Sequence, residues 1–202
     1  MNLSLKIVLT GGPCSGKSSL IEALSKRGYD TVPEQAITVI EQLIQTWGED
    51  AFTKWKTLNT PAFQQLIFNA QRKIENQITP KECCFFDRGM LDPLAYLIHN
   101  GLPTPDTMLY ISKQASYDMV IVCDTLNSFD QRKHTGRTES KTESIKIGNL
   151  ISQTYLRAGF HVIRLSEASI EERTEIVLAL MEQLSSNMLT LDPTHQSSTD
   201  FR

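Results

Sequence analysis

A glycine-rich segment near the start of the chain constrains the fold more than any other feature of the sequence. Residues 11–18 read GGPCSGKS and match the pattern G-x-x-x-x-G-K-[ST] in full. The apolar run 5–10 before the segment is expected to be a strand, and residues 18–26 after it are expected to be a helix with one apolar face. A strand, a glycine turn and a helix in this order predict a loop that binds phosphate groups.

The chemistry of phosphate binding explains the residue types in this loop. Glycines allow the backbone to come close to a polyphosphate, and successive N–H groups then form a nest for the anion. We expect Lys17 to reach the β- and γ-phosphates of a nucleotide and the Ser18 hydroxyl to ligate Mg²⁺. The residues predicted to bind the nucleotide are Gly11, Gly12, Pro13, Cys14, Ser15, Gly16, Lys17, Ser18 and Ser19.

Short apolar runs alternate with longer helical patterns along the chain, which is typical of an α/β fold with a parallel sheet. Further strands are expected at residues 29–33, 83–86, 119–123 and 160–165, and further helices at residues 35–47, 63–78, 91–99, 147–158 and 169–184. Residues 125–142 are polar without periodicity and are predicted to be a long, mobile loop. We predict one domain over residues 1–184 and a disordered tail over residues 185–202.

Composition and charge exclude several classes of protein. The chain has 20 Lys and Arg against 23 Asp and Glu, so it lacks the basic surplus of a dedicated nucleic-acid binder. Its longest apolar run, 176–181, is far shorter than the roughly 20 residues of a membrane span, and its start does not resemble a signal peptide. The four cysteines form no C-x-x-C pair, which argues against a zinc site and favours reduced thiols in a cytoplasmic protein.

Two of the expected strands end in an aspartate, and a phosphate loop of this type works with such a carboxylate near Mg²⁺. Asp87 is followed by Arg88 and Gly89, so a metal-facing carboxylate would stand beside a phosphate-facing guanidinium. Asp124 leads directly into the polar loop and would only begin a turn. We therefore expect Ser18 and Asp87 to hold the metal. For Arg88, the alternative to a phosphate-binding role is a surface ion pair.

Two other groups fit a role in phosphoryl transfer. Glu34 stands at the expected end of the second strand, where a carboxylate can take the proton of an attacking hydroxyl; the alternative is an acid favoured by a helix N-terminus. The polar loop carries four basic residues: Arg132, Lys133, Arg137 and Lys141. An arginine that closes over the γ-phosphoryl group would stabilise its charge, so we predict a lid with Arg132 and Arg137; a solvated charged loop is the alternative.

Several segments together resemble one family. They are Thr10–Leu20, Gly28-Tyr29, Val32–Glu34, Phe86–Gly89 with Asp92, Ala95-Tyr96 and Tyr117-Asp118. On these segments, about residues 5–184 are similar to the small P-loop, AAA-type ATP-binding proteins of the NadR-like class. That class resembles the ribosylnicotinamide kinase domain of a bifunctional NAD regulator and, more distantly, deoxynucleoside and thymidylate kinases.

The resemblance implies a P-loop kinase-like fold with about five parallel strands in the order 2-3-1-4-5, helices on both faces, a mobile lid, and binding of ATP with Mg²⁺. It places functional roles on the loop residues 11–18 and on Glu34, Asp87, Arg88 and Asp92. The lid arginine of the family best matches Arg137.

The chain departs from this family on the acceptor side. Ile37 stands where an arginine is common, and Asp124-Thr125-Leu126 stand where prolines and a tryptophan are common. These changes concern the group that receives the phosphate rather than the phosphate loop.

Two hypotheses of different classes follow. The first is a phosphotransferase that moves the γ-phosphoryl group of ATP·Mg²⁺ to a small, nucleoside-like acceptor, with five candidate catalytic residues: Lys17, Glu34, Asp87, Arg88 and Arg137. The alternative is a nucleotide-binding regulator with slow or no hydrolysis, which the altered acceptor side favours. GTP stays open as the nucleotide because phosphate-loop contacts ignore the base, although the chain has no [NT]-K-x-D motif. A lipid-associated nucleotide binder is a third possibility that rests on family analogy alone.

Overall fold

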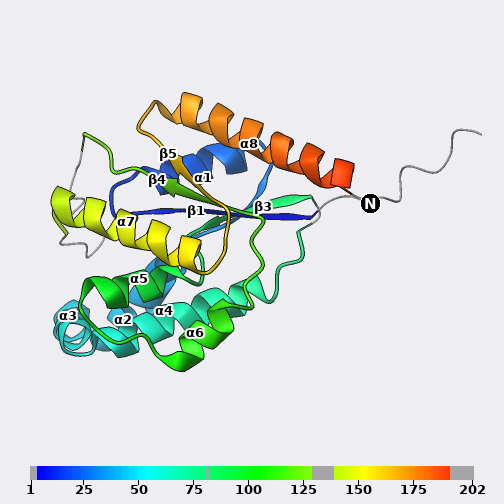
Figure 1. The fold of residues 1–202 in the computed structure, drawn as a ribbon. Helices are drawn as coiled ribbons and strands as arrows, with labels where there is room; N and C mark the ends of the chain where they lie inside the picture. Colours follow the sequence, from blue (N-terminus) through cyan, green and yellow to red (C-terminus); the bar gives the residue numbers. More distant parts are fainter. Residues whose placement is uncertain (1–3, 81, 129–138, 192–202) are drawn as a thin grey trace, which may run out of the picture.

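Five parallel strands form the central sheet, in the order β2-β3-β1-β4-β5 (Figure 1). The computed structural model describes residues 4–80, 82–128 and 139–191. The strands are β1 (Leu5–Gly11), β2 (Asp30–Val32), β3 (Cys83–Asp87), β4 (Met119–Cys123) and β5 (Val162–Leu165). The α/β fold and the strand order expected from the sequence are therefore confirmed.

Eight helices accompany the sheet in the described part of the chain. They are α1 (Lys17–Lys26), α2 (Gln35–Trp47), α3 (Glu49–Leu58), α4 (Thr60–Glu75), α5 (Asp92–His99), α6 (Asp106–Ser112), α7 (Lys141–Arg157) and α8 (Ile170–Leu191). Helices α1 and α8 cover one face of the sheet, whereas α4, α5 and α7 cover the other (Figure 1). None of the helices described combines the length and apolarity that a membrane crossing requires.

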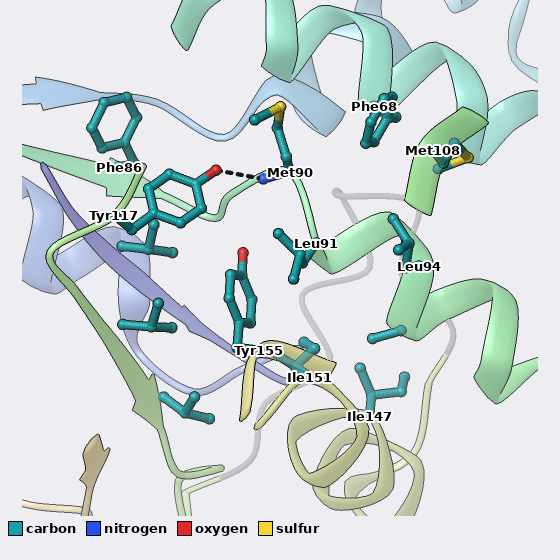
Figure 2. Packing of buried hydrophobic residues seen from close by; sticks show 14 of the residues in the cluster. Phe68, Phe86, Met90, Leu91, Leu94, Met108, Tyr117, Ile147, Ile151 and Tyr155 are labelled. Carbon is teal, nitrogen blue, oxygen red and sulfur yellow. Dashed lines mark hydrogen bonds between the residues drawn. The ribbon is translucent and has the colours of Figure 1, made fainter. Parts of the chain in front are cut away.

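Side chains of the central strand β1 alternate between the two faces, and both faces are apolar. Val8 joins one buried cluster. Figure 2 shows other members of this cluster, among them Phe68 of α4 and Ile151 of α7. Ile7 and Leu9 join the opposite cluster, under α1 and α8. Burial on both faces explains why the central strands appear in the sequence as continuous apolar runs.

Two of the helices were not expected from the sequence. Helix α3 buries a single side chain, Phe52, so its sequence shows little apolar periodicity. Phe52 joins Val39 of α2 and Phe63 of α4 in a small cluster of its own. Helix α6 follows Pro105, which stands at the helix N-cap in an extended conformation.

The helices beside the polar loop and the tail also differ from expectation. Helix α7 begins at Lys141 after a capping box, in which Ser140 Oγ accepts from the Glu143 N–H at 3.3 Å and Glu143 Oε2 accepts from the Ser140 N–H at 2.7 Å. Helix α8 runs past the domain boundary expected at residue 184 because Met188 still packs against the α1–α8 cluster. Residues 129–138 and 192–202 lie outside the described part of the chain.

Candidate functional site

The glycine-rich loop joins β1 to α1 at the carboxyl edge of the sheet, where doubly wound folds bind ligands. Lys17 is the first residue of α1, and its ammonium folds back onto the loop. Its Nζ donates to Gly12 O at 2.9 Å and to Ser15 Oγ at 3.0 Å. Only 3% of Lys17 is exposed, so the lysine expected to bind phosphate is held against oxygens of the loop itself.

Helix α7 supports the loop from the other side of the sheet edge. A Cβ on Gly12 would lie 2.1 Å from Ser144 O, so only glycine allows this close approach. The Ser144 hydroxyl donates to Pro13 O at 2.5 Å and also lies 2.8 Å from Thr125 Oγ1. The loop is therefore fixed by contacts from a helix that begins more than a hundred residues later in the chain.

Ser18 and Asp87, the expected metal ligands, are in contact. Strand β3 pairs with β1 in the register Leu9↔Asp87, which brings Asp87 to the edge where the loop begins. Ser18 Oγ donates to Asp87 Oδ2 at 3.1 Å, while Asp87 Oδ1 is buried and has no hydrogen-bond partner among the described residues. Burial raises the pKa of Asp87, and the charge of Lys17 opposes this effect. A hydroxyl beside a carboxylate oxygen without a partner is an oxygen donor set that suits Mg²⁺.

Asp124, the alternative ligand, has other partners. Its Oδ1 accepts from Arg164 Nε at 3.0 Å and also from Arg164 Nη2. Arg164 comes from the edge strand β5 and is partly exposed, so this contact is a surface ion pair. The contacts of the two aspartates favour Asp87 as the residue nearer to the phosphate loop.

Glu34 and Arg88 form a buried ion pair rather than the surface pair considered as the alternative for Arg88. Glu34 precedes α2, and its Oε1 accepts from Arg88 Nε at 2.8 Å. Arg88 Nη1 donates to Gly11 O at 3.2 Å and to Asp92 Oδ1 at 2.9 Å. Burial lowers the pKa of Arg88, but the charges of Glu34 and its other acidic neighbours together outweigh this effect, so the pKa lies well above its ordinary value.

Asp92, which the family resemblance brought forward, accepts four hydrogen bonds. Its Oδ1 accepts from Thr10 Oγ1 at 2.5 Å as well as from Arg88. Its Oδ2 accepts from the Gly89 N–H at 3.2 Å and from the Tyr155 hydroxyl at 2.8 Å. Asp92 thus links β1, α5 and α7 beneath Arg88 and fixes the position of the guanidinium.

A second buried group near Arg88 was not expected from the sequence. Gln71 Nε2 donates to Arg88 O at 3.1 Å and to Glu75 Oε1 at 2.8 Å. The Tyr117 hydroxyl donates to Glu75 at 2.7 Å and accepts from the Met90 N–H at 2.8 Å (Figure 2). Burial raises the pKa of Glu75 to about 7. Tyr117 was noted in the sequence as part of the family resemblance, whereas Gln71 and Glu75 are polar residues on a helix and gave no signal of this group.

The lid arginines cannot be placed in this site. Arg132, Lys133 and Arg137 lie outside the described residues, so their approach to a nucleotide stays a prediction. Lys141, the fourth basic residue of the expected loop, begins α7, and its Nζ donates to Asn127 Oδ1 at 3.2 Å. The described site therefore consists of the phosphate loop, the Ser18–Asp87 contact and the Glu34–Arg88 pair.

Comparisons with known proteins agree with this geometry. The family described as an AAA domain matches residues 6–173. No protein with curated annotation matches the chain. Among solved structures, a deoxyadenosine kinase from M. mycoides with bound dATP has a TM-score of 0.63 at 19% identity, over 88% of this chain and 100% of that chain.

Two thymidylate kinases have similar structures. The enzyme from Candida albicans has a TM-score of 0.56 at 15% identity, over 89% of this chain and 92% of that chain. The enzyme from Ehrlichia chaffeensis has a TM-score of 0.61 at 11% identity, over 88% of this chain and 98% of that chain. At such identities the likeness concerns the fold, and function has to be argued from the site.

Proposed function

Because the chain belongs to the AAA domain family and folds as a P-loop domain, we propose that it is a phosphotransferase that moves the γ-phosphoryl group of ATP to a small, nucleoside-like acceptor. One observation carries the proposal. The Lys17 loop, the Ser18–Asp87 contact and the buried Glu34–Arg88 pair lie together at one edge of the sheet. Phosphoryl transfer needs these three functions: phosphate binding, metal binding and a base near the acceptor.

Lys17 and the loop N–H groups bind the β- and γ-phosphates in this proposal. Two of the hydrogen-bond acceptors of Lys17, the Gly12 carbonyl and the Ser15 hydroxyl, are neutral. A phosphate oxygen carries a full charge and makes a stronger hydrogen bond, so it displaces them. Arg137, with Arg132, would close over the same phosphates from the lid.

Ser18 Oγ and Asp87 Oδ1 would hold Mg²⁺ in this proposal. The unpartnered oxygen of Asp87 supports this assignment, because a buried carboxylate oxygen is otherwise costly. When bound, the ion neutralises part of the charge on the β- and γ-phosphates.

Glu34 is the candidate general base. The Arg88 guanidinium holds it in place and favours its ionised form, which is the form that accepts a proton. The acceptor hydroxyl oxygen forms a bond to the γ-phosphorus, the bond to ADP breaks, and the hydroxyl proton passes to Glu34. Among the described residues, the longest hydrogen bond of the Arg88 guanidinium is that of Nη2, 3.5 Å to the Tyr96 hydroxyl, which makes this nitrogen our candidate for binding the acceptor.

The test is ADP release by the wild-type protein with ATP, Mg²⁺ and a panel of nucleosides and related metabolites. We expect one class of acceptor to increase ADP release and to yield a phosphorylated product by mass spectrometry. Glu34→Gln should lower kcat about a hundredfold while the Kd for ATP stays unchanged, because Glu34 acts on the acceptor. Lys17→Ala should abolish ATP binding and leave the fold intact. Absence of any acceptor-dependent product would contradict the proposal.

A nucleotide-binding regulator is the second candidate function. The observation in its favour is that Glu34 and Arg88 are only 5% exposed each, so the acceptor side is closed in this conformation. A regulator of this kind would bind ATP or GTP tightly, release ADP at the same slow rate with every acceptor, and bind a partner in one nucleotide state only. Partner binding of equal affinity in all nucleotide states would exclude this regulatory function.

A further inference from the structure

A third cation lies behind the phosphate loop, where neither the motif nor the proposed mechanism uses it. Arg173 of α8 is fully buried, with 0% of the residue exposed. Its Nη1 donates to Ser15 O at 2.9 Å. The same nitrogen lies 2.8 Å from the point that a Cβ on Gly16 would occupy, so the guanidinium sits directly against the loop backbone.

The charge of Arg173 has no counterion among the residues that the structure describes. Its Nε and Nη2 are buried without a hydrogen-bond partner, and none of the ion pairs found in residues 4–80, 82–128 and 139–191 includes it. The other buried guanidinium, Arg88, is paired with Glu34 and Asp92. A buried charge without a partner destabilises a folded protein, so its position calls for an anionic ligand nearby.

The hydrogen bond from Arg173 to Ser15 O also determines where the next backbone donor, the Gly16 N–H, points. In a trans peptide the C=O and the following N–H point in opposite directions. When Arg173 holds Ser15 O from behind, the Gly16 N–H must point away from α8. This orientation directs it toward the side of the loop on which an anion nest would bind phosphate.

We propose that Arg173 is a positioning residue of the phosphate loop, which orients the Ser15–Gly16 peptide and adds its unpaired positive charge to the binding of a nucleoside triphosphate. This inference rests on the proposed function. Lys17 also contacts Ser15, because its Nζ donates to Ser15 Oγ at 3.0 Å. This hydrogen bond has to break when Lys17 binds phosphate. Arg173 is buried and stays, so the loop keeps its shape when Lys17 turns to the ligand.

The test compares binding of three probes by calorimetry: Mg·ATP, Mg·tripolyphosphate and adenosine. Arg173→Met keeps much of the side-chain volume but removes the charge and the donor. We expect it to weaken Mg·ATP and Mg·tripolyphosphate about tenfold or more and to leave adenosine unchanged. The melting temperature of the free variant should equal or exceed that of the wild type, because an unpaired buried charge has been removed. A purely structural arginine would lower it.

The matched control is Arg27→Met. Arg27 joins the same two helices, α1 and α8, through ion pairs with Glu171 and Glu175, but it is partly exposed and distant from the loop in these contacts. The Arg27→Met variant should bind all three probes with the same Kd values as the wild type. Arg173→Lys keeps the charge without the planar fork and should bind Mg·ATP with an intermediate Kd, which decides the question if the methionine variant does not fold.

Each outcome separates this inference from the proposed function. Equal Kd values for Mg·tripolyphosphate in the wild type, Arg173→Met and Arg173→Lys would overturn the role of Arg173 and leave the proposed function standing. Failure of the wild type to bind either Mg·ATP or Mg·tripolyphosphate would overturn both. A loss of adenosine binding equal to the loss of ATP binding would show a general structural defect and would also overturn the inference.

Discussion

Arg88 connects several parts of the site through hydrogen bonds to Glu34, Gly11 and Asp92. Its φ of +71° lies in the left-handed region, which residues other than glycine rarely adopt. This turn lets consecutive residues serve different partners: Asp87 contacts Ser18, and Arg88 contacts Glu34. Gln71 holds the carbonyl of Arg88 and thereby helps to keep the unusual backbone in place.

Removal of Arg88 should destabilise the whole protein. Arg88→Met leaves Glu34 and Asp92 buried without their cation, and we expect a loss of ~3–5 kcal/mol in the free energy of unfolding. Arg164→Met breaks a partly exposed pair with Asp124 and should cost less than ~1 kcal/mol. Urea unfolding monitored by circular dichroism measures both. Similar losses in the two variants would argue against the buried pair.

The choice between the two aspartates as metal ligand is also a matter of single residues. Asp87→Asn should raise the Mg²⁺ concentration that half-saturates ATP binding by about tenfold, because the amide supplies a weaker ligand than the carboxylate. Asp124→Asn should leave this concentration unchanged, since Asp124 is engaged with Arg164. The assignment of Asp87 is wrong if the opposite pattern is observed.

At the scale of elements, α7 joins two parts of the site. Ser144 and Gly148, one turn apart, approach the phosphate loop, while Tyr155 further along the same helix donates to Asp92. A movement of α7 would therefore disturb the phosphate loop and the Arg88 network together. The helix begins at Lys141, near the end of the segment 125–142 that was expected to form a lid.

A pair of glycine variants tests this packing. A methyl group at Gly12 would lie 2.1 Å from Ser144 O, so Gly12→Ala has to push α7 away and should cost ~1–3 kcal/mol of unfolding free energy. At Gly148, across the same contact, the nearest atom would be Gly12 N at 3.4 Å. Gly148→Ala should be close to neutral. The helix preference of alanine, ~1 kcal/mol over glycine, offsets any cost of the new contact with Gly12. Equal costs in denaturant titrations would contradict the close approach.

Helix α4 shows where periodicity misleads. The apolar repeat from Phe63 to Ile78 indicates one face, but the residues buried in the helix include Gln64, Gln71 and Glu75. Leu66, which belongs to the same apolar repeat, is 39% exposed. The helix is rotated from expectation because its polar side chains find partners, such as Tyr117, that belong to other elements.

At the scale of the whole molecule, Glu75 gives the stability a dependence on pH. The pKa of Glu75 is about 7 in the folded chain, against 4.5 as its ordinary value. Between these values the folded protein keeps a proton that the unfolded chain releases. The unfolding free energy should therefore fall as pH rises from ~5 to ~8, by about 3 kcal/mol from this group, since a pKa difference of one corresponds to ~1.4 kcal/mol.

Glu75→Gln should flatten this dependence, because the amide has no proton to lose and can still accept from Tyr117. Part of the slope should remain, since the pKa of Asp87 is also raised. Glu22→Gln is the control: Glu22 is exposed, and its hydrogen bond with Lys26 lowers its pKa, so the variant should keep the fall. The measurement is urea unfolding across this range of pH, and parallel curves for wild type and Glu75→Gln would refute the prediction.

The strand order was implied by the family resemblance, whereas the shared location of four candidate residues could be expected because parallel strands end at one edge. Ser18, Glu34 and Arg88 follow β1, β2 and β3, and Asp87 is the last residue of β3, so the fold brings the four residues to one edge of the sheet. Arg173 could not be found in this way. Its partner, Ser15, is 158 residues away in the chain, and a lone arginine on a helix is normally exposed.

Gln71 and Tyr155 were missed for a similar reason. Their roles depend on how α4 and α7 are rotated about their axes, which the tertiary contacts decide. The lid arginines Arg132 and Arg137 were expected from composition, and they stay a prediction because they lie outside the described residues.

The three buried side-chain atoms found without partners in the described residues have a consequence for evolution and engineering. They belong to Asp87 and Arg173, the two residues that touch the phosphate loop at Ser18 and Ser15. Each such atom costs about 1–3 kcal/mol, so a screen for heat resistance without ligand should replace these two residues early. The resulting proteins would be more robust and poorer at holding phosphate, a trade-off between durability and activity that is located at two named positions.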